Sequence, residues 1–378
     1  MQSIGAYATA RISRKQVVVC LLLCTFVFIG VIFFPFGTSG GVWDGLVFCG
    51  EILIPSLFPF MFLASFFVKS GLADVSGSMY GRLTEKIFRL PGATFGTVIL
   101  GLVGGYPIGA RGVKELYENG EINEEQAQRM MQYLVCAGPA FVISFIGAKI
   151  YNSMEIGVIL FLSQLITAIL LGVVSARFVK SERTQSIQKA VKPKKDFSAS
   201  FVESCSDASK GMFSMCGMVI LFSAFLGVLN SCGFSEIMHS ILLCFNLSDG
   251  TSANAFPMMF EITKGCFLCL NQAVPVEFMA FAVGFGGICV HFQVFSILSS
   301  MNINKIKFIL FRFVHGIIAA IITGIALRIF SPSEEVFGSY KTVTNPGIST
   351  SFIGSLALIC MCICFLFSLH ISKKPKSA

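Results

Sequence analysis

Long apolar runs constrain this chain more than any other feature of its sequence. Of its 378 residues, 54% are hydrophobic and only 13% are charged, and a water-soluble protein of this length could not bury so much apolar surface. About 20 apolar residues are enough for a helix to cross a bilayer. Runs of roughly this length occupy residues 17–36, 44–68, 128–150, 155–178, 212–230, 277–300, 308–330 and 350–371. The sequence therefore predicts an all-α integral membrane protein with about eight transmembrane helices. The first run is too long for the core of a cleaved signal peptide, so we expect it to be retained.

Two further apolar segments are too broken to be ordinary spans, and they occupy matching places in the two halves of the chain. The first is Gly92–Gly112, which ends in GGYPIGARG, and the second is Ala253–Asn271, which contains FEITKGC. Paired Gly/Pro-interrupted segments of this kind indicate the substrate site of a secondary transporter. We expect each of them to form a re-entrant hairpin.

The distribution of charge predicts the topology. The formal net charge is +8, and the basic residues fall in loops, as the positive-inside rule describes, so no nucleic-acid partner is expected. Residues 179–200 hold six Lys and Arg and are predicted to form a cytoplasmic linker. If each hairpin enters and leaves by one face, every basic cluster and both termini lie in the cytoplasm.

With these hairpins, both halves have the order span, hairpin, span, span, and the second half is inverted relative to the first. The fold is thus expected to be an inverted repeat. The predicted parts are an N-terminal transmembrane helix (1–43), a first repeat (44–178), the basic linker (179–200), an inverted second repeat (201–330), and an outer loop with a final helix and a basic tail (331–378).

The first hairpin should break at Tyr106, which follows two glycines and precedes Pro107. Proline removes a hydrogen-bond donor and disfavours helix at the residue before it. Free amides at the start of the next helix suit an anion, and Arg111 adds a full positive charge. The alternative is a kink that only allows close helix packing, with Arg111 reaching the membrane surface.

The second hairpin carries Glu261 and Lys264, which are three residues apart and so on one face of a helix. Ionisable groups at such a depth are functional candidates by default. The alternative is an ion pair between the two that only holds the hairpin together.

Two more polar clusters lie within the apolar runs. His291 and Gln293 follow a glycine pair, and histidine titrates near physiological pH, although a lone histidine can equally be hydrogen-bonded to a neighbouring helix. Gln164 and His315 are weaker candidates on apolar helices. The predicted substrate site comprises Gly104, Gly105, Tyr106, Pro107, Gly109, Arg111, Gly138, Pro139, Glu261, Thr263, Lys264, Gly286, Gly287, His291 and Gln293.

Neither enzymatic chemistry nor a cofactor is predicted. The chain has no P-loop, no G-x-S-x-G, no H-E-x-x-H and no acidic cluster with metal-ligand spacing. Cys266 and Cys269 form a C-x-x-C, which is compatible with metal or redox chemistry. No second pair or histidine follows at ligand spacing, so packing is the favoured interpretation and no metal is expected.

Four motifs occur in order along residues 44–330: GYPIGA at Gly105–Ala110, AGPAF at Ala137–Phe141, EITKG at Glu261–Gly265 and FGGICVHFQ at Phe285–Gln293. On these motifs the chain resembles the nucleoside-recognition, or gate, domain family, and within it a branch of sporulation integral membrane proteins. The resemblance implies a fold shared with concentrative nucleoside transporters and the membrane part of ferrous-iron transporters, with inverted repeats and re-entrant hairpins. It also implies a role in spore formation and in moving dipicolinic acid towards the forespore.

The expected function is alternating-access transport of a small organic anion, dipicolinic acid by the resemblance. Lys264 and Arg111 would bind carboxylate, and Glu261 and His291 would couple transport to protons. The expected partners are the lipid bilayer and the anionic solute, and a homo-oligomer is left open. The expected location is the cell membrane or a membrane around the forespore. The alternatives are a non-transporting scaffold or signalling protein of spore assembly and a transporter of a nucleoside or a divalent metal.

Overall fold

The computed structural model describes residues 21, 25, 28–178 and 196–330, and every regular element within them is helical. The predicted all-α membrane fold is confirmed for this part of the chain. Part of the expected first helix (17–36), the basic linker up to residue 195, and the final loop, helix and tail lie outside the described residues.

Five helical segments of the described chain are long and apolar enough to cross a membrane. They are Pro35–Lys69, Met154–Arg177, Phe197–Ser231, Val276–Ile297 and Lys305–Phe330, and they coincide with five of the eight expected spans. The count becomes six if Met79–Phe88 and Gly92–Val103, which meet at an angle of 99°, are one bent span. The full number of spans and the inverted repeat remain predictions.

The longest of these segments pack through small residues. Helices α2 (Pro35–Phe48) and α3 (Ile54–Lys69), joined by the π-helical turn η1 (Cys49–Leu53), lie against α9 (Phe197–Ser231). A methyl group on Gly41 would lie 2.3 Å from the Ser223 carbonyl oxygen, and one on Gly227 would lie 2.0 Å from that of Gly37. Only glycine permits backbones to approach so closely, as is common between membrane helices.

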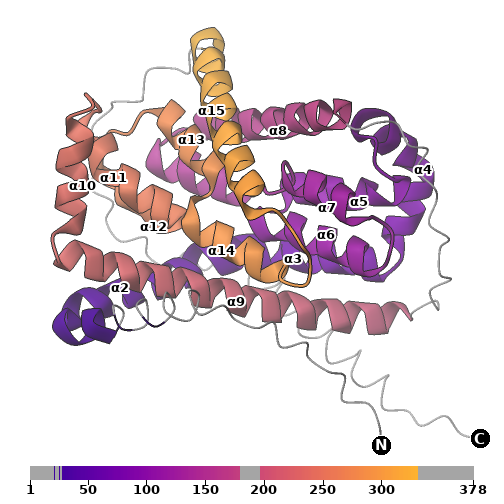
Figure 1. The fold of residues 1–378 in the computed structure, drawn as a ribbon, viewed down its shortest axis with the longest axis horizontal. Coiled ribbons are helices and arrows are strands. Elements are labelled where there is room, and N and C mark those ends of the chain that lie inside the picture. Colours follow the sequence, from indigo (N-terminus) through magenta and orange to yellow (C-terminus); the bar gives the residue numbers. More distant parts are fainter. Residues whose placement is uncertain (1–20, 22–24, 26–27, 179–195, 331–378) are drawn as a thin grey trace, which may run out of the picture.

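A second layer consists of α8 (Met154–Arg177), α13 (Val276–Phe285) and α15 (Lys305–Phe330). Gln164 of α8 lies 2.9 Å from His315 of α15 and also donates to the Ala280 carbonyl of α13 at 2.8 Å. In Figure 1, α8 and α9 run along opposite edges of the molecule, and the shorter helices α5, α6, α12 and α14 lie between them.

Both predicted hairpins are helix–break–helix units. The first comprises η2 (Gly92–Thr94), α5 (Phe95–Val103) and α6 (Tyr106–Glu118). The second comprises α11 (Asp249–Phe260), α12 (Ile262–Leu268) and η4 (Cys269–Asn271). The first hairpin breaks at Gly104–Gly105, directly before Tyr106, where the sequence predicts the break. The second breaks at Glu261, a position that the sequence did not specify. The structure contains no bilayer, so their re-entrant course remains a prediction.

The expected continuous span over 128–150 is wrong. Helix α7 (Glu124–Met131) ends early, residues 132–138 are irregular, and the π-helix η3 (Ala140–Ile150) follows. Gly138 and Pro139 lie at this break, where proline cannot donate its amide to a continuing helix. Helix α7 begins at a reciprocal capping box formed by Asn123 and Gln126.

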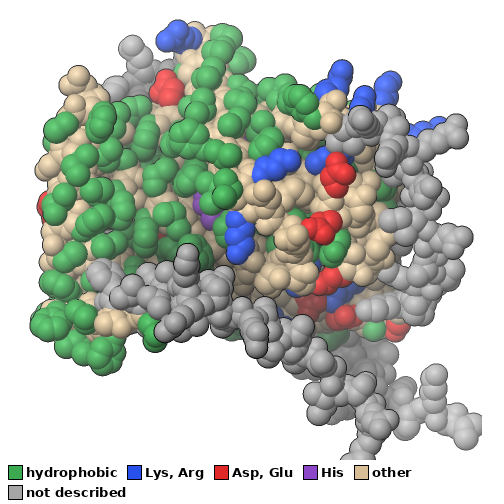
Figure 2. Space-filling model, in the orientation of Figure 1, with side chains coloured by type: hydrophobic (Ala, Val, Ile, Leu, Met, Phe, Trp, Pro, Cys, Tyr) green, Lys and Arg blue, Asp and Glu red, His purple; other side chains and the backbone are tan. Residues whose placement is uncertain are grey.

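The remaining elements are α4 (Leu72–Phe88), α10 (Phe234–Leu243) and α14 (Gly287–Ile297). Hydrophobic side chains cover the part of the surface over α10, α11 and α15, whereas charged side chains gather towards the end that contains α4 to α7 (Figure 2). The first region has the composition of a lipid-facing surface, and the second that of a surface in water.

Candidate functional site

Four breaks in the helical backbone meet inside the molecule. A methyl group on Gly105 would lie 3.8 Å from the Gly138 amide nitrogen, and one on Gly286 would lie 3.3 Å from the Tyr106 ring. A methyl group on Gly287 would lie 3.1 Å from the Ile262 amide nitrogen. We call this cluster the central crossing; it comprises residues 104–106, 137–139, 260–262 and 285–287. It brings together most of the site residues predicted from the sequence.

Two of these breaks depend on glycine. Gly105 has a φ of +106°, and Gly286 and Gly287 have φ values of +86° and +74°, a region that residues with a Cβ rarely adopt. Gly109, one turn into α6, has a different role: its Cβ would lie 1.9 Å from the Leu134 carbonyl oxygen. The glycines of the first hairpin thus set both its bend and its close packing against the irregular segment.

Side chains from two other helices, α6 and α15, satisfy the carbonyl groups near the end of α13. The Tyr106 hydroxyl donates to the Val283 carbonyl at 2.8 Å. The guanidinium of Arg312 donates to the Gly284 carbonyl and, at 3.4 Å, to the Phe285 carbonyl. The last carbonyls of a helix lack partners within it and carry partial negative charge, so a cation is stabilised there.

Arg312 was missed by the sequence analysis, although an arginine inside the apolar run 308–330 is a detectable signal. Arg312 is only 1% exposed. The sequence singled out His315, only three residues later on the same helix, and passed over the stronger charge.

Glu261 acts as the N-cap of α12 and is 1% exposed. Its carboxylate accepts from the Thr263 amide at 3.2 Å, the Thr263 hydroxyl at 2.5 Å and the Lys264 amide at 2.5 Å.

The Lys264 ammonium instead pairs with Asp44 of α2 and lies 5.6 Å from the ring centre of Phe267. The considered Glu261–Lys264 ion pair is therefore wrong, because only the Lys264 amide reaches Glu261. Asp44 was also missed; its signal is an aspartate at the edge of an apolar run.

His291 and Gln293 of α14 are buried beside the central crossing. The His291 ring lies against Phe285, with ring centres 4.7 Å apart, and against Phe308 at 5.4 Å. Its Nε2 atom has no hydrogen-bond partner within the described chain. The Gln293 amide lies 3.4 Å from the Cys289 sulfur.

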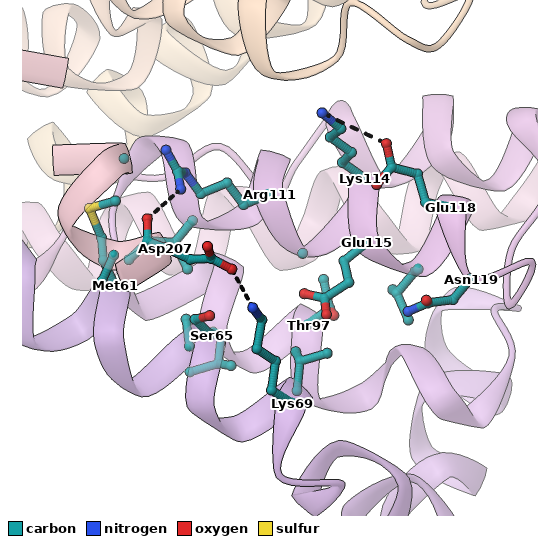
Figure 3. A pocket seen from close by; sticks show the side chains of 18 of the residues that line it. Met61, Ser65, Lys69, Thr97, Arg111, Lys114, Glu115, Glu118, Asn119 and Asp207 are labelled. Atoms are coloured by element: carbon teal, nitrogen blue, oxygen red, sulfur yellow. Dashed lines mark hydrogen bonds and ion pairs between the residues drawn. The ribbon is translucent and has the colours of Figure 1, made fainter. Parts of the chain in front are cut away.

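A pocket of about 920 Å³ opens beside the first hairpin, between α3, α6 and α9 (Figure 3). Arg111 extends into it from α6 and donates at 3.5 Å to the Asp207 carbonyl. Its guanidinium fills the space next to Gly211, whose Cβ would lie 2.2 Å from Nη2. Ile108 also lines the pocket and contacts Gly104, so the wall of the pocket borders the central crossing.

The rest of the pocket has mixed charge. Lys69 of α3 pairs with Glu203 at 2.9 Å and with Asp207, both from α9, and Lys114 pairs with Glu118 at 3.7 Å. Glu203 and Asp207 thus join α9 to α3. Lys264 is not among the residues that line this pocket. The two basic residues expected to bind carboxylate therefore lie in different surroundings, Arg111 beside α9 and Lys264 beside α2.

The C-x-x-C motif is packed among sulfur atoms and backbone. The Cys266 sulfur lies 3.5 Å from that of Met279, and the Cys269 thiol donates to the Gly265 carbonyl at 3.2 Å. Among the described residues, no group of three or more His, Cys, Asp or Glu side chains could hold a metal ion.

Comparison with known proteins gives one informative match. No family model matches the chain, and no solved structure does. A protein described as sporulation integral membrane protein YlbJ, from Bacillus subtilis (strain 168), is 23% identical over 363 residues, which cover 86% of this chain and 88% of that protein. The match confirms the resemblance to the sporulation branch, whereas the gate domain remains a prediction. The chain is thus an integral membrane protein that is similar over most of its length to this sporulation protein.

Proposed function

We propose that this protein transports a small organic anion across the membrane by alternating access. Dipicolinic acid is the substrate that the resemblance to the sporulation branch implies. The observation that supports the proposal most strongly is the central crossing, where four breaks in helical backbone lie together inside a membrane protein.

Broken backbone is costly at membrane depth, because each unpaired amide or carbonyl group lacks water to bind. It is tolerated where it is buried in protein or lines a water-filled path, and transporters use such discontinuous helices to bind substrate. A protein that served only as a scaffold would have no need of four such breaks in contact with one another.

The pocket beside the first hairpin offers an entrance of suitable size. Its volume of about 920 Å³ falls within the range typical of small-molecule sites. Arg111 lines the pocket from the part of α6 that follows the crossing. Its side-chain hydrogen bond goes to a carbonyl group, whereas Lys69 is neutralised by two carboxylates. We propose Arg111 as the first residue to meet the anion.

Lys264 is proposed as a second carboxylate-binding residue, released when substrate takes the place of Asp44. Glu261 and His291 are proposed to carry coupling protons, because both are buried beside the crossing. Cytoplasmic termini, and location in the cell membrane or a membrane around the forespore, complete the proposal.

The test is uptake of labelled dipicolinate into proteoliposomes that contain the purified protein, with and without a proton gradient. We expect uptake by the parent and its loss in Arg111→Gln and Lys264→Ala. Arg328→Gln, an equivalent change at the exposed end of α15, is the matched control and should transport normally. Absence of uptake by a correctly inserted parent under both conditions would refute transport of this substrate and favour the scaffold function.

A further inference from the structure

Arg312 carries a positive charge into the interior, and no residue that the structure describes balances it with a negative charge. Two of its nitrogens bind the carbonyl groups of Gly284 and Phe285, but Nη1 has no partner within the described chain. A buried charge is strongly unfavourable unless it is paired, and a buried unpaired donor requires an explanation.

The described groups around Arg312 supply no carboxylate. The titratable side chains of the described residues that interact with it electrostatically are Tyr106 of α6, Cys136 of the irregular segment, His291 of α14 and His315 of α15. Tyrosine, cysteine and histidine are neutral or cationic at neutral pH. The carbonyl groups of α13 contribute only partial charge.

Arg129 shows that helix capping alone does not account for this arrangement. It also is buried and donates to two carbonyls at a helix end, those of Phe88 and Arg89 after α4, both at 2.9 Å. Glu125, one turn earlier on α7, interacts electrostatically with Arg129 and supplies a full negative charge. Arg129 also has an unpartnered nitrogen, Nε, so the difference between the two residues is the acid. Arg312 has the same capping role, but no described residue supplies it with a carboxylate.

A second unpartnered nitrogen lies in the same place. His291 contacts the rings of Phe285 and Phe308, and its Nε2 lacks a partner. Phe285 also accepts from Arg312, and Phe308 precedes Arg312 by one turn on the same face of α15. Two buried nitrogens without partners among the described residues thus flank the same pair of aromatic rings. Nη1 of Arg312 is always a donor, and Nε2 of His291 donates to an anion when the imidazole is protonated.

We infer that Arg312 and His291 form a buried subsite for one carboxylate group of a small organic anion. This inference rests on the proposed function and identifies the inner end of the anion's transport path. Tyr106, whose hydroxyl binds α13 beside Arg312, begins α6 two residues before Ile108, which lines the pocket. Displacement of Tyr106 would connect the pocket with the subsite.

The test measures binding and transport on the same preparations. Thermal unfolding of the purified protein is followed during titration with dipicolinate, and with pyridine-2,6-dicarboxamide as an uncharged analogue of equal shape. We expect the dianion but not the diamide to stabilise the parent. Arg312→Gln should weaken dipicolinate binding by at least about tenfold, because it removes a charge-assisted hydrogen bond. His291→Gln should cause a smaller loss.

Arg129→Gln is the matched control. It removes a buried capping arginine from another helix end, so it should lower the unfolding midpoint without changing affinity for dipicolinate. If Arg312→Gln does not fold, Arg312→Lys retains the charge without the planar fork, and we expect weakened but measurable binding.

The two proposals fail in different ways. Unchanged dipicolinate affinity in a folded Arg312→Gln or Arg312→Lys protein would overturn the subsite, even if uptake by the parent persisted. Binding that requires Arg312, without uptake by the parent, would support the subsite and refute transport. A parent that binds neither compound would overturn the subsite directly.

Discussion

Removal of the Tyr106 hydroxyl should loosen the contact between the first hairpin and α13. The hydroxyl donates to the Val283 carbonyl at 2.8 Å, and Val283 is 1% exposed. Tyr106→Phe keeps the ring that contacts Gly286 and removes only this hydrogen bond. The change therefore isolates one link across the central crossing.

The expected magnitude follows from the burial of the carbonyl group. A buried acceptor that loses its donor costs about 1–3 kcal/mol, which corresponds to a change of about 5- to 150-fold in an equilibrium between two states. If the hydrogen bond exists only when α6 is docked on α13, Tyr106→Phe should increase the population of the undocked state by this factor.

Hydrogen exchange of the peptide amides measures this population locally. We expect exchange over residues 283–290 to accelerate by about 5- to 150-fold in Tyr106→Phe, while the middle of α8 stays unchanged. Tyr117→Phe, the same substitution near the other end of α6, is the control and should leave residues 283–290 as in the parent. Equal exchange rates in all three proteins would refute the view that this hydrogen bond holds the crossing together.

Two further predictions concern close packing and the Lys264 ion pair. Gly109→Ala would place a methyl group 1.9 Å from the Leu134 carbonyl oxygen, so it should lower the free energy of unfolding by about 3 kcal/mol or more. The control is Gly217→Ala, which has nothing within 4 Å of the added methyl group and should raise the free energy of unfolding by roughly 0.5–1 kcal/mol. Thermal unfolding in detergent compares the two variants. Asp44→Asn should destabilise the protein by about 1 kcal/mol, because Asp44 is partly exposed. The double variant with Lys264→Met should recover part of that loss, and strictly additive effects would contradict the ion pair.

The breaks in the helices were predictable because their causes are local. Glycine and proline act on their own backbone and on the adjacent residue, so the bends at Gly105 and at Gly138–Pro139 can be read from sequence. The same local rule was misapplied over 128–150, where hydropathy favoured one continuous helix. There the break outweighs hydropathy, because the irregular backbone packs against the first hairpin at Gly109.

Pairings between distant residues were not predictable in this way. Helical spacing placed Glu261 beside Lys264, but spacing does not exclude a partner 220 residues away, and Asp44 is that partner. Glu261 is engaged by two backbone amides at the start of α12, which are nearer than any ammonium group. The choice between partners depends on where α2 lies, and no single segment of sequence encodes that.

The carboxyl end of α13 links the two halves of the chain. Tyr106 and Gln164, from the first predicted repeat, and Arg312, from the second, all donate to carbonyl groups of this one helix. α6 therefore cannot move away from α13 without loss of the Tyr106 hydrogen bond. A carboxylate bound to Arg312 would compete with the α13 carbonyl groups for the guanidinium, and so would weaken the hold on that helix end. By linkage, any conformation that frees the guanidinium binds the anion more tightly. Anion binding and the hold on the carboxyl end of α13, to which Tyr106 of the first repeat is also bonded, would thus be coupled through a single arginine.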